Sequence, residues 1–134
     1  MSLQINSEKA GDVTVLTCAG EIDLGSAPQL REVLAPIFNE AKPRLLVDLS
    51  SVGFMDSTGI GIMVNALNRV REKSGACAFC GAGPRVHRIL QIAGLINALP
   101  LHDTRAEALA ALAGKNGAKG ASRSGASRLA SDAS

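Results

Sequence analysis

A near-continuous apolar run in the middle of the chain places the strongest constraint on the fold. Residues Arg44–Leu49 contain four large aliphatic side chains in six positions. Such a run is typical of a strand buried on both faces, which occurs in sheets that carry helices on their surfaces. Amphipathic helical patterns lie before and after this run, so we expect it to belong to an α/β domain.

Strand and helix patterns alternate along residues 1–113. The predicted elements are strands at Leu3–Ser7 and Asp12–Ala19 joined by a turn at Ala10-Gly11, a helix that begins after Ser26, the strand at Arg44–Leu49, a helix from Ser57 to about Gly75, a strand at Ala76–Cys80, a helix from Pro84 to about Gly94, an edge strand around Ala98–Leu101 and a helix from Thr104 to about Gly114. Strand–helix–strand units imply parallel pairing with right-handed crossovers, and the opening hairpin adds an antiparallel pair. The sequence therefore predicts a mixed β-sheet of four to five strands with about four helices packed against it.

Capping patterns mark the starts of two of these helices. Ser26 with Gln29, and Thr104 with Glu107, each have the spacing of a capping box. Pro36 predicts a kink or an early end in the first helix. The apolar face of that helix is formed by Leu30, Val33, Leu34, Ile37 and Phe38.

The charge of the chain is unevenly distributed. The net charge is +2 over 134 residues, and residues 114–134 account for +3, so residues 1–113 sum to −1. This Gly/Ala/Ser-rich basic segment has one large apolar side chain, Leu129, so we expect residues 1–113 to form one domain and residues 114–134 a disordered tail. The domain has no basic patch interleaved with aromatic residues, which argues against nucleic-acid binding.

Other features of the sequence point to a reduced, cytoplasmic protein. No run is long and apolar enough to span a membrane, and the first residues lack the pattern of a signal peptide. Cys77 and Cys80 form a CxxC pair within a predicted strand, where odd spacing places them on opposite faces. We therefore expect core packing rather than metal or redox chemistry, and no cofactor.

The segment around Ser57 carries the chemistry. Ser57 stands where a helix begins, and backbone N–H groups and the helix dipole at such a place tolerate a phosphate well. The alternative is that Ser57 is only a helix N-cap. Gly59 and Gly61 lower helix propensity in the first turn, which suggests that a partner approaches bare backbone there.

A second interpretation of this segment is that Ser57 is the nucleophile of a serine hydrolase. A strand, a turn, a serine and a helix resemble a nucleophile elbow, although Met55 stands where that motif has its first glycine. A catalytic serine also needs a histidine, and no sequence signal places His87 or His102 beside Ser57. We therefore expect a binding protein rather than an enzyme.

The stretch Phe54–Gly61, after the strand that contains Asp48, resembles the signature of STAS domains of the anti-sigma factor antagonist family. Gly20–Asp23 resembles the first loop of that family, and the similarity extends over roughly residues 3–113. The resemblance implies that the unphosphorylated chain binds an anti-sigma factor that is also a serine kinase, and thereby releases a sigma factor for transcription. It implies that this kinase uses ATP to phosphorylate Ser57, which switches binding off, and that a serine phosphatase reverses the change.

The resemblance also implies site residues. Asp23 and Asp56 align with acidic residues of the recognition surface of the family, and we expect them to orient the loops, although turn formation or capping is an equal alternative for Asp56. Thr58 replaces a second serine found in many relatives, so it is an alternative phosphorylation site. A STAS domain in a stressosome-like scaffold, a transporter tail or a lipid-transport complex is the alternative function.

Two further residues receive predictions from helical spacing and strand pattern alone. Ile62 is predicted to lie on the polar face of its helix, opposite Met63, which makes it a candidate for partner contact. Asp48 lies inside a buried strand pattern, so we expect a structural hydrogen-bonding role for it. The predicted partner-binding set is Asp23, Asp56, Ser57, Thr58, Gly59, Gly61 and Ile62.

Overall fold

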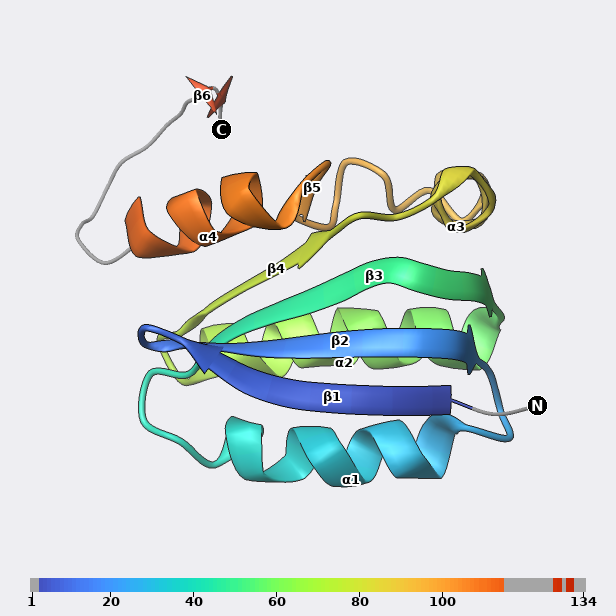
Figure 1. The fold of residues 1–134 in the computed structure, drawn as a ribbon, viewed down its shortest axis with the longest axis horizontal. Coiled ribbons are helices and arrows are strands. Elements are labelled where there is room, and N and C mark those ends of the chain that lie inside the picture. Colours follow the sequence, from blue (N-terminus) through green and yellow to red (C-terminus); the bar gives the residue numbers. More distant parts are fainter. Residues whose placement is uncertain (1–2, 115–126, 129, 132–134) are drawn as a thin grey trace.

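The fold is a five-stranded mixed β-sheet with helices on both faces (Figure 1). The computed structural model describes residues 3–114, 127–128 and 130–131. The elements are β1 (Leu3–Ala10), β2 (Val13–Ile22), α1 (Ala27–Phe38), β3 (Arg44–Met55), α2 (Ser57–Glu72), β4 (Ala76–Cys80), α3 (Pro84–Ile92), β5 (Leu101–His102) and α4 (Arg105–Gly114). The strands lie in the order β1-β2-β3-β4-β5; β1 and β2 are antiparallel, and the other pairs are parallel. The predicted fold class is confirmed.

Most of the predicted tail lies outside the described residues. Gly114 is the last residue of α4, one position beyond the predicted domain end. Within the tail, β6 (Ser127–Arg128) and β7 (Ala130–Ser131) pair as a separate two-stranded sheet. Disorder in the rest of residues 114–134 remains a prediction.

The first two strands and β3 are longer than predicted. The hairpin turn lies at Gly11-Asp12, one residue later than expected, and Gly11 takes a positive φ of 63° that favours glycine. β2 continues to Ile22, so the predicted loop beginning at Gly20 is mostly strand, with register irregularities on either side of Gly20. β3 continues to Met55, directly before Asp56.

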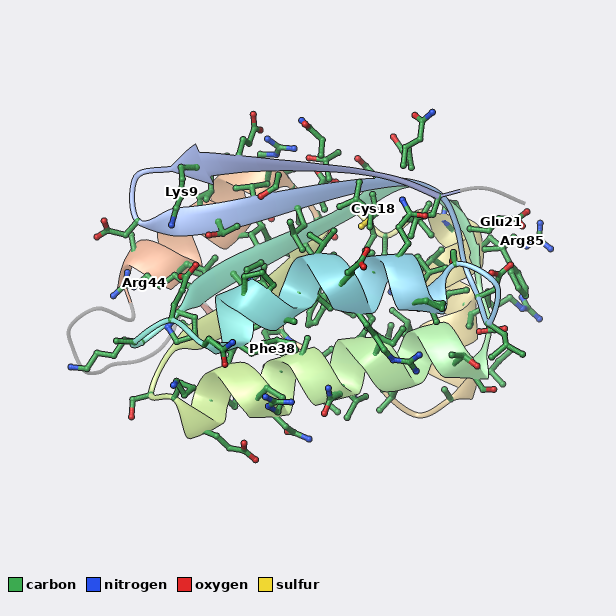
Figure 2. All side chains as sticks on the ribbon, turned by 90° about the horizontal axis from the view of Figure 1, so that it is seen from below. Lys9, Cys18, Glu21, Phe38, Arg44 and Arg85 are labelled. Carbon is green, nitrogen blue, oxygen red and sulfur yellow. The ribbon has the colours of Figure 1, made fainter. Side chains whose placement is uncertain are left out.

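Two apolar cores lie on the two faces of the sheet. The larger core joins buried side chains of α1, α2 and α3 to one face, and the smaller core joins Ala108 and Leu112 of α4 to the other. In Figure 2, α1 and α2 lie in front of the sheet and α4 lies behind it. Cys77 belongs to the larger core and Cys80 to the smaller, which confirms that they point to opposite faces. Burial raises the pKa of the Cys77 thiol to about 12 and that of Cys80 to about 11, so both side chains are protonated core residues.

The first helix begins differently from the prediction. The Ser26 side chain makes no capping hydrogen bond, and its hydroxyl donates instead to the carbonyl of Glu21 at 2.8 Å. The Gln29 amide donates to the carbonyl of Leu3 at 2.8 Å, so the predicted capping box is absent. Pro36 lies two residues before the last residue of α1, in agreement with an early end. At α4, Thr104 accepts from the N–H of Glu107 at 3.1 Å, as a capping residue does.

A polar cluster joins α4 to the sheet. Arg105 donates to Asp48 at 2.9 and 3.2 Å, and also to Glu8 and Thr17, each at 2.9 Å. Burial alone would raise the pKa of Asp48, but hydrogen bonds from Ser50 and Arg105 outweigh it and hold that pKa below its usual value. The predicted structural role of Asp48 is confirmed.

Candidate functional site

The pairing of β2 with β3 brings two acidic residues to one end of the sheet. Ile22 is opposite Met55 in the parallel register, and each is the last residue of its strand. Asp23 directly follows β2 and Asp56 directly follows β3, so the predicted pair lies side by side where the two strands end. The N–H of Asp56 donates to the carbonyl of Ile22 at 3.2 Å, which fixes this arrangement.

Asp56 is the N-cap of α2 and also holds the neighbouring loop. One carboxylate oxygen, Oδ1, accepts from the N–H of Gly59 at 3.0 Å. The other oxygen, Oδ2, accepts from the N–H of Leu24 at 3.1 Å. A single carboxylate therefore caps the helix and ties the loop after β2 to the start of the helix. The capping alternative stated for Asp56 is confirmed.

Asp23 stabilises the loop after β2 through hydrogen bonds within that loop. Its Oδ1 accepts from the N–H of Ser26 at 3.0 Å, and the Ser26 hydroxyl accepts from the N–H of Asp23 at 3.0 Å. Reciprocal bonds of this kind close a compact turn. The turn presents Leu24, whose side chain is 72% exposed. The sequence analysis did not include Leu24, although a large aliphatic residue in a loop of Asp, Gly and Ser is a signal that was available.

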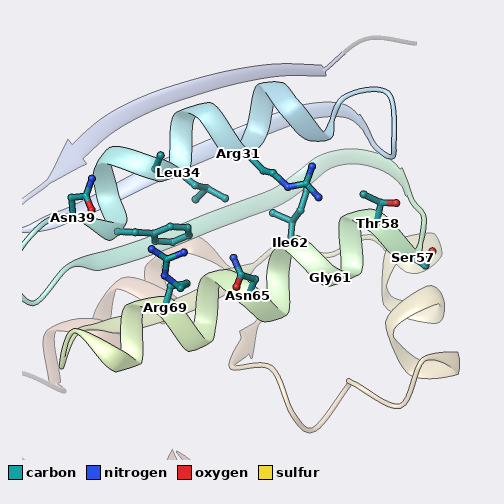
Figure 3. A pocket seen from close by; sticks show the side chains of 11 residues that line it. Arg31, Leu34, Asn39, Ser57, Thr58, Gly61, Ile62, Asn65 and Arg69 are labelled. Atoms are coloured by element: carbon teal, nitrogen blue, oxygen red, sulfur yellow. The ribbon is translucent and has the colours of Figure 1, made fainter.

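Ser57 and Thr58 differ in orientation. Ser57 is the first residue of α2 and is exposed, so the alternative that it serves only as the N-cap is wrong because Asp56 fills that position. Thr58 is half-buried, and Figure 3 shows its side chain directed toward α1 while Ser57 lies at the outer end of the helix. The accessible hydroxyl at this helix start is therefore that of Ser57.

The two glycines of the first turn have different environments. A Cβ on Gly59 would lie 2.5 Å from the carbonyl oxygen of Ile22 and 2.6 Å from Cγ of Met55. Gly59 is thus required by the packing of α2 on β2 and β3, and the prediction that a partner approaches its backbone is wrong because it is buried. Gly61 is exposed, and a Cβ there would meet no atom within 4 Å, so its bare backbone is open to a partner.

Ile62 does not lie on a polar face. It is 4% exposed and belongs to the larger core, so the predicted exposure is wrong. The error arose because helical spacing alone cannot show that α1 packs along α2 and covers Ile62. The small exposed part of Ile62 contributes to the lining of a groove.

This groove runs between α1 and α2 and has a volume of about 640 Å³ (Figure 3). Its floor and walls include Leu34, Phe38 and Ile62, and Ser57 and Thr58 lie at one end. Arg69 stacks on the Phe38 ring, with its guanidinium carbon 4.9 Å from the ring centroid. No histidine is among the lining residues.

The two histidines lie elsewhere. His87 and His102 line a separate pocket of about 260 Å³ beside Asp103, in the region of α3 and β5. Ser57 is not among the lining residues of this pocket, and neither histidine lines the groove beside Ser57. Among residues 3–114, 127–128 and 130–131, no group of three or more His, Cys, Asp or Glu side chains is placed to hold a metal ion. None of the helices in the described part of the chain is long and apolar enough to cross a membrane.

The start of α3 lies at the end of the molecule where β2 and β3 end. Arg85 lies over the ring of Phe54, with its guanidinium carbon 5.4 Å from the ring centroid. Figure 2 labels Glu21 and Arg85 at this end. A hydroxyl, an exposed leucine and charged side chains thus gather on one surface.

Fold and site define a small α/β domain with a polar surface where its parallel strands end. The chain belongs to the STAS domain family, whose model matches residues 4–108. It is 33% identical over 95 residues to a protein named anti-sigma-B factor antagonist from Staphylococcus epidermidis, a match that covers 71% of this chain and 88% of the relative. A crystal structure of an anti-sigma factor antagonist from Mycobacterium paratuberculosis has a TM-score of 0.77 at 29% identity, covering 84% of this chain and 96% of the other.

A more distant likeness concerns the fold alone. Structures of the anti-sigma factor antagonist SpoIIAA in its unphosphorylated form and of Bacillus SpoIIAA in its phosphorylated form match with TM-scores of 0.70 and 0.64, at 23% and 19% identity. They cover 82% and 81% of this chain, and 96% and 98% of the SpoIIAA chains. Anti-sigma factor antagonists are non-enzymatic STAS proteins, which agrees with the expectation that this chain is not an enzyme.

Proposed function

We propose that this protein is an anti-sigma factor antagonist whose binding is switched off by phosphorylation of Ser57. In its unphosphorylated form it binds an anti-sigma factor with serine-kinase activity and so releases a sigma factor. The kinase transfers the γ-phosphoryl group of ATP to the Ser57 hydroxyl, and a serine phosphatase removes it. The protein acts in the cytoplasm, where transcription takes place.

Exposure of Ser57 at the start of α2 is the observation that carries this proposal. Its hydroxyl is accessible on a surface that also presents Leu24 and Gly61, so a partner that covers this surface contacts the serine directly. Asp23 and Asp56 fix the loop and the helix start that carry these residues. Their role in recognition is therefore to hold the contact surface in one geometry.

The position of the serine also explains how a phosphate acts without unfolding the domain. A phosphoserine adds about 1.5–2 negative charges at neutral pH. At the first position of a helix, these charges interact favourably with the positive end of the helix dipole. The folded domain tolerates the phosphate, while a partner surface that was complementary to a neutral hydroxyl is repelled.

Thr58 is a poorer acceptor for the same kinase. Its side chain is half-buried and directed toward α1, so a kinase cannot reach it without displacing the groove side chains around it. Ser57→Ala should therefore abolish phosphorylation of the chain by the kinase, and Thr58→Val should preserve it. Mass spectrometry after reaction with the kinase reads both outcomes.

The binding experiment compares Ser57→Asp with Ser57→Ala. The full chain and both variants are used to capture the anti-sigma factor kinase from native cells, and affinity is then measured with the purified kinase. We expect Ser57→Ala to bind as the unmodified chain does and Ser57→Asp to bind at least tenfold more weakly. Ser7→Asp is the matched control, since Ser7 is exposed on β1 and is not among the residues of this surface. Equal binding by Ser57→Asp would contradict the switch and favour a constitutive STAS scaffold.

A further inference from the structure

We propose that the groove between α1 and α2 is the docking site for an acidic segment of the protein partner, whose carboxylate side chains bind Arg31 and Arg69. This inference rests on the proposed function, because the partner is the anti-sigma factor kinase. It adds the chemistry by which that partner is recognised. Three features of the groove carry it: the accessible lining, the charge and the continuity with Ser57.

The accessible lining of the groove is polar. Leu34 and Ile62 are 1% and 4% exposed, so they offer almost no apolar surface to a ligand. The exposed lining residues are Arg31, Ala35, Asn39, Ser57, Gly61, Asn65 and Arg69. Most of these residues carry guanidinium, amide or hydroxyl groups, so the groove suits a partner that forms hydrogen bonds.

The charge of the groove is positive. Arg31 and Arg69 line it, and none of the lining residues is acidic. Within residues 3–114, neither arginine forms a salt bridge with an acidic side chain. Arg69 also stacks on the Phe38 ring, which restrains its guanidinium. A carboxylate in the groove therefore gains charge-assisted hydrogen bonds without displacing an acidic side chain of the domain.

The two arginines are spaced along the groove. Figure 3 shows the Arg31 side chain extending from α1 toward Ile62. Arg69 follows Ile62 by seven residues in α2, which corresponds to ~10 Å along the helix axis. A single carboxylate cannot reach both arginines at that separation, whereas a peptide segment with two or more acidic side chains can.

The groove is continuous with the contact surface around Ser57. Ser57 and Gly61 line the groove and also belong to that surface. A partner that covers Ser57 therefore extends into the groove. A phosphate on Ser57 adds about 1.5–2 negative charges at one end of it. The carboxylates of the partner are then repelled, which gives the phosphorylation switch an electrostatic cause.

A nucleic acid fits the groove less well than an acidic protein segment does. Phe38 is only 8% exposed and its ring is covered by Arg69, so it offers no free aromatic face on which a base could stack. Residues 1–113 carry a net charge of −1. Nucleic-acid-binding domains are usually strongly basic, so the charge of this domain favours a protein partner.

The first test measures the affinity of the purified kinase for variants of the full chain. Arg31→Gln and Arg69→Gln should each raise the dissociation constant about fivefold, and the double variant should raise it more than tenfold. Arg71→Gln is the matched control, since Arg71 is exposed on the same helix and does not line the groove. Added salt should weaken binding of the parent more than that of the double variant. Unchanged affinity in the double variant would overturn the proposal.

The second test needs no kinase. Hexaglutamate is titrated into the full chain at neutral pH and low ionic strength, and amide shifts are followed by NMR. We expect saturable shifts at groove residues such as Gly61, Asn65 and Arg69, with at least fivefold weaker binding in the double variant and none of these shifts with hexalysine. Shifts confined to residues 115–134, which contain four basic side chains, would contradict the proposal. Tighter binding of a thymidine hexanucleotide at the same amides would contradict it too.

These experiments distinguish failure of the switch from failure of the docking site. Equal binding of the kinase by Ser57→Asp and Ser57→Ala contradicts the switch, while shifts of the groove amides by hexaglutamate still support the acidic-segment site. The reverse result, weaker kinase binding by Ser57→Asp without any hexaglutamate shifts in the groove, supports the switch and rejects the site.

Discussion

At the scale of single residues, Asp56 is the side chain on which the geometry of the surface depends. Its two oxygens bind the N–H groups of Gly59 and Leu24, which belong to segments far apart in the sequence. Asp56→Ala should lower the free energy of unfolding by about 1–2 kcal/mol, a range typical of a lost N-cap. Chemical denaturation measures this loss.

The same substitution should also loosen the loop locally. The amide of Leu24 loses its acceptor in Asp56→Ala, so its hydrogen exchange should become faster by more than the global loss of stability explains. Asp56→Asn is the matched control, because its amide oxygen still caps Gly59 and its loss of stability should be smaller. Equal exchange at Leu24 in Asp56→Ala and in the parent would show that the loop is held by other contacts.

The two glycines of α2 should respond in opposite directions to the same change. Gly61→Ala adds a methyl group into open space and should stabilise the helix by about 0.5–1 kcal/mol. Gly59→Ala brings Cβ within 2.5 Å of the Ile22 carbonyl oxygen and should destabilise the fold by roughly 1–3 kcal/mol, because backbone must move. Thermal unfolding of the two variants gives the signs, and destabilisation by Gly61→Ala would contradict this account.

Sequence patterns predicted which residues matter here better than they predicted how each one acts. The Asp56–Gly59 segment was recognised, yet the cap was assigned to Ser57 as well as to Asp56, because both residue types cap helices and only the backbone geometry separates them. Ile62 was misplaced because its burial comes from α1, a contact between elements that periodicity along one helix does not contain. Leu24 stands out in the sequence as a large aliphatic residue in a polar loop, but its hydrogen bond to Asp56 is a tertiary contact that no local pattern contains.

At the scale of elements, the attachment of α4 depends on Arg105 and Asp48. The folded-state pKa of Asp48 lies below the unfolded value of about 4, so its contribution to stability is present above that pH and is lost as the pH falls through the folded pKa. Asp48→Asn should therefore lower the free energy of unfolding by about 1–2 kcal/mol at pH 7, a modest figure because solvent screens Arg105, which is 37% exposed. The difference from the parent should shrink as the pH is lowered below about 4.

Urea denaturation at several pH values measures this dependence. Glu8→Gln is the control, since Glu8 contacts the same arginine with a side chain that is 51% exposed. Its effect should stay below about 0.5 kcal/mol. A constant difference between Asp48→Asn and the parent from pH 7 to pH 3 would contradict the role assigned to the carboxylate.

The order of elements was predictable, while their ends were not. β4 matches its prediction at both ends, because an apolar run bounded by a glycine on each side has clear limits. β3 extends through Ser50-Ser51 to Met55, and exposed and buried residues are mixed in this stretch. The predicted strand ends at Leu49, where the continuous apolar run stops, because the sequence pattern does not show that pairing with β2 continues to Met55.

At the scale of the whole molecule, the domain and the tail can be separated experimentally. We expect a chain of residues 1–114 to fold on its own, because the described side chains of both apolar cores lie within residues 3–112. Its midpoint of thermal unfolding should lie within a few degrees of that of the full chain. A large decrease would show that residues 115–134 stabilise the domain, contrary to the prediction that they are disordered.

The hydrogen bond between Asp56 and Leu24 fixes the shape of the surface but not its chemical character. The loop is held by the backbone N–H of Leu24, which every residue except proline possesses, while the side chain projects into solvent. Replacing Leu24 by another non-proline residue therefore changes what a partner meets without changing where the loop stands. The residue at this position can differ between several such domains in one cell. Each domain then binds its own partner, although all of them keep the same fold.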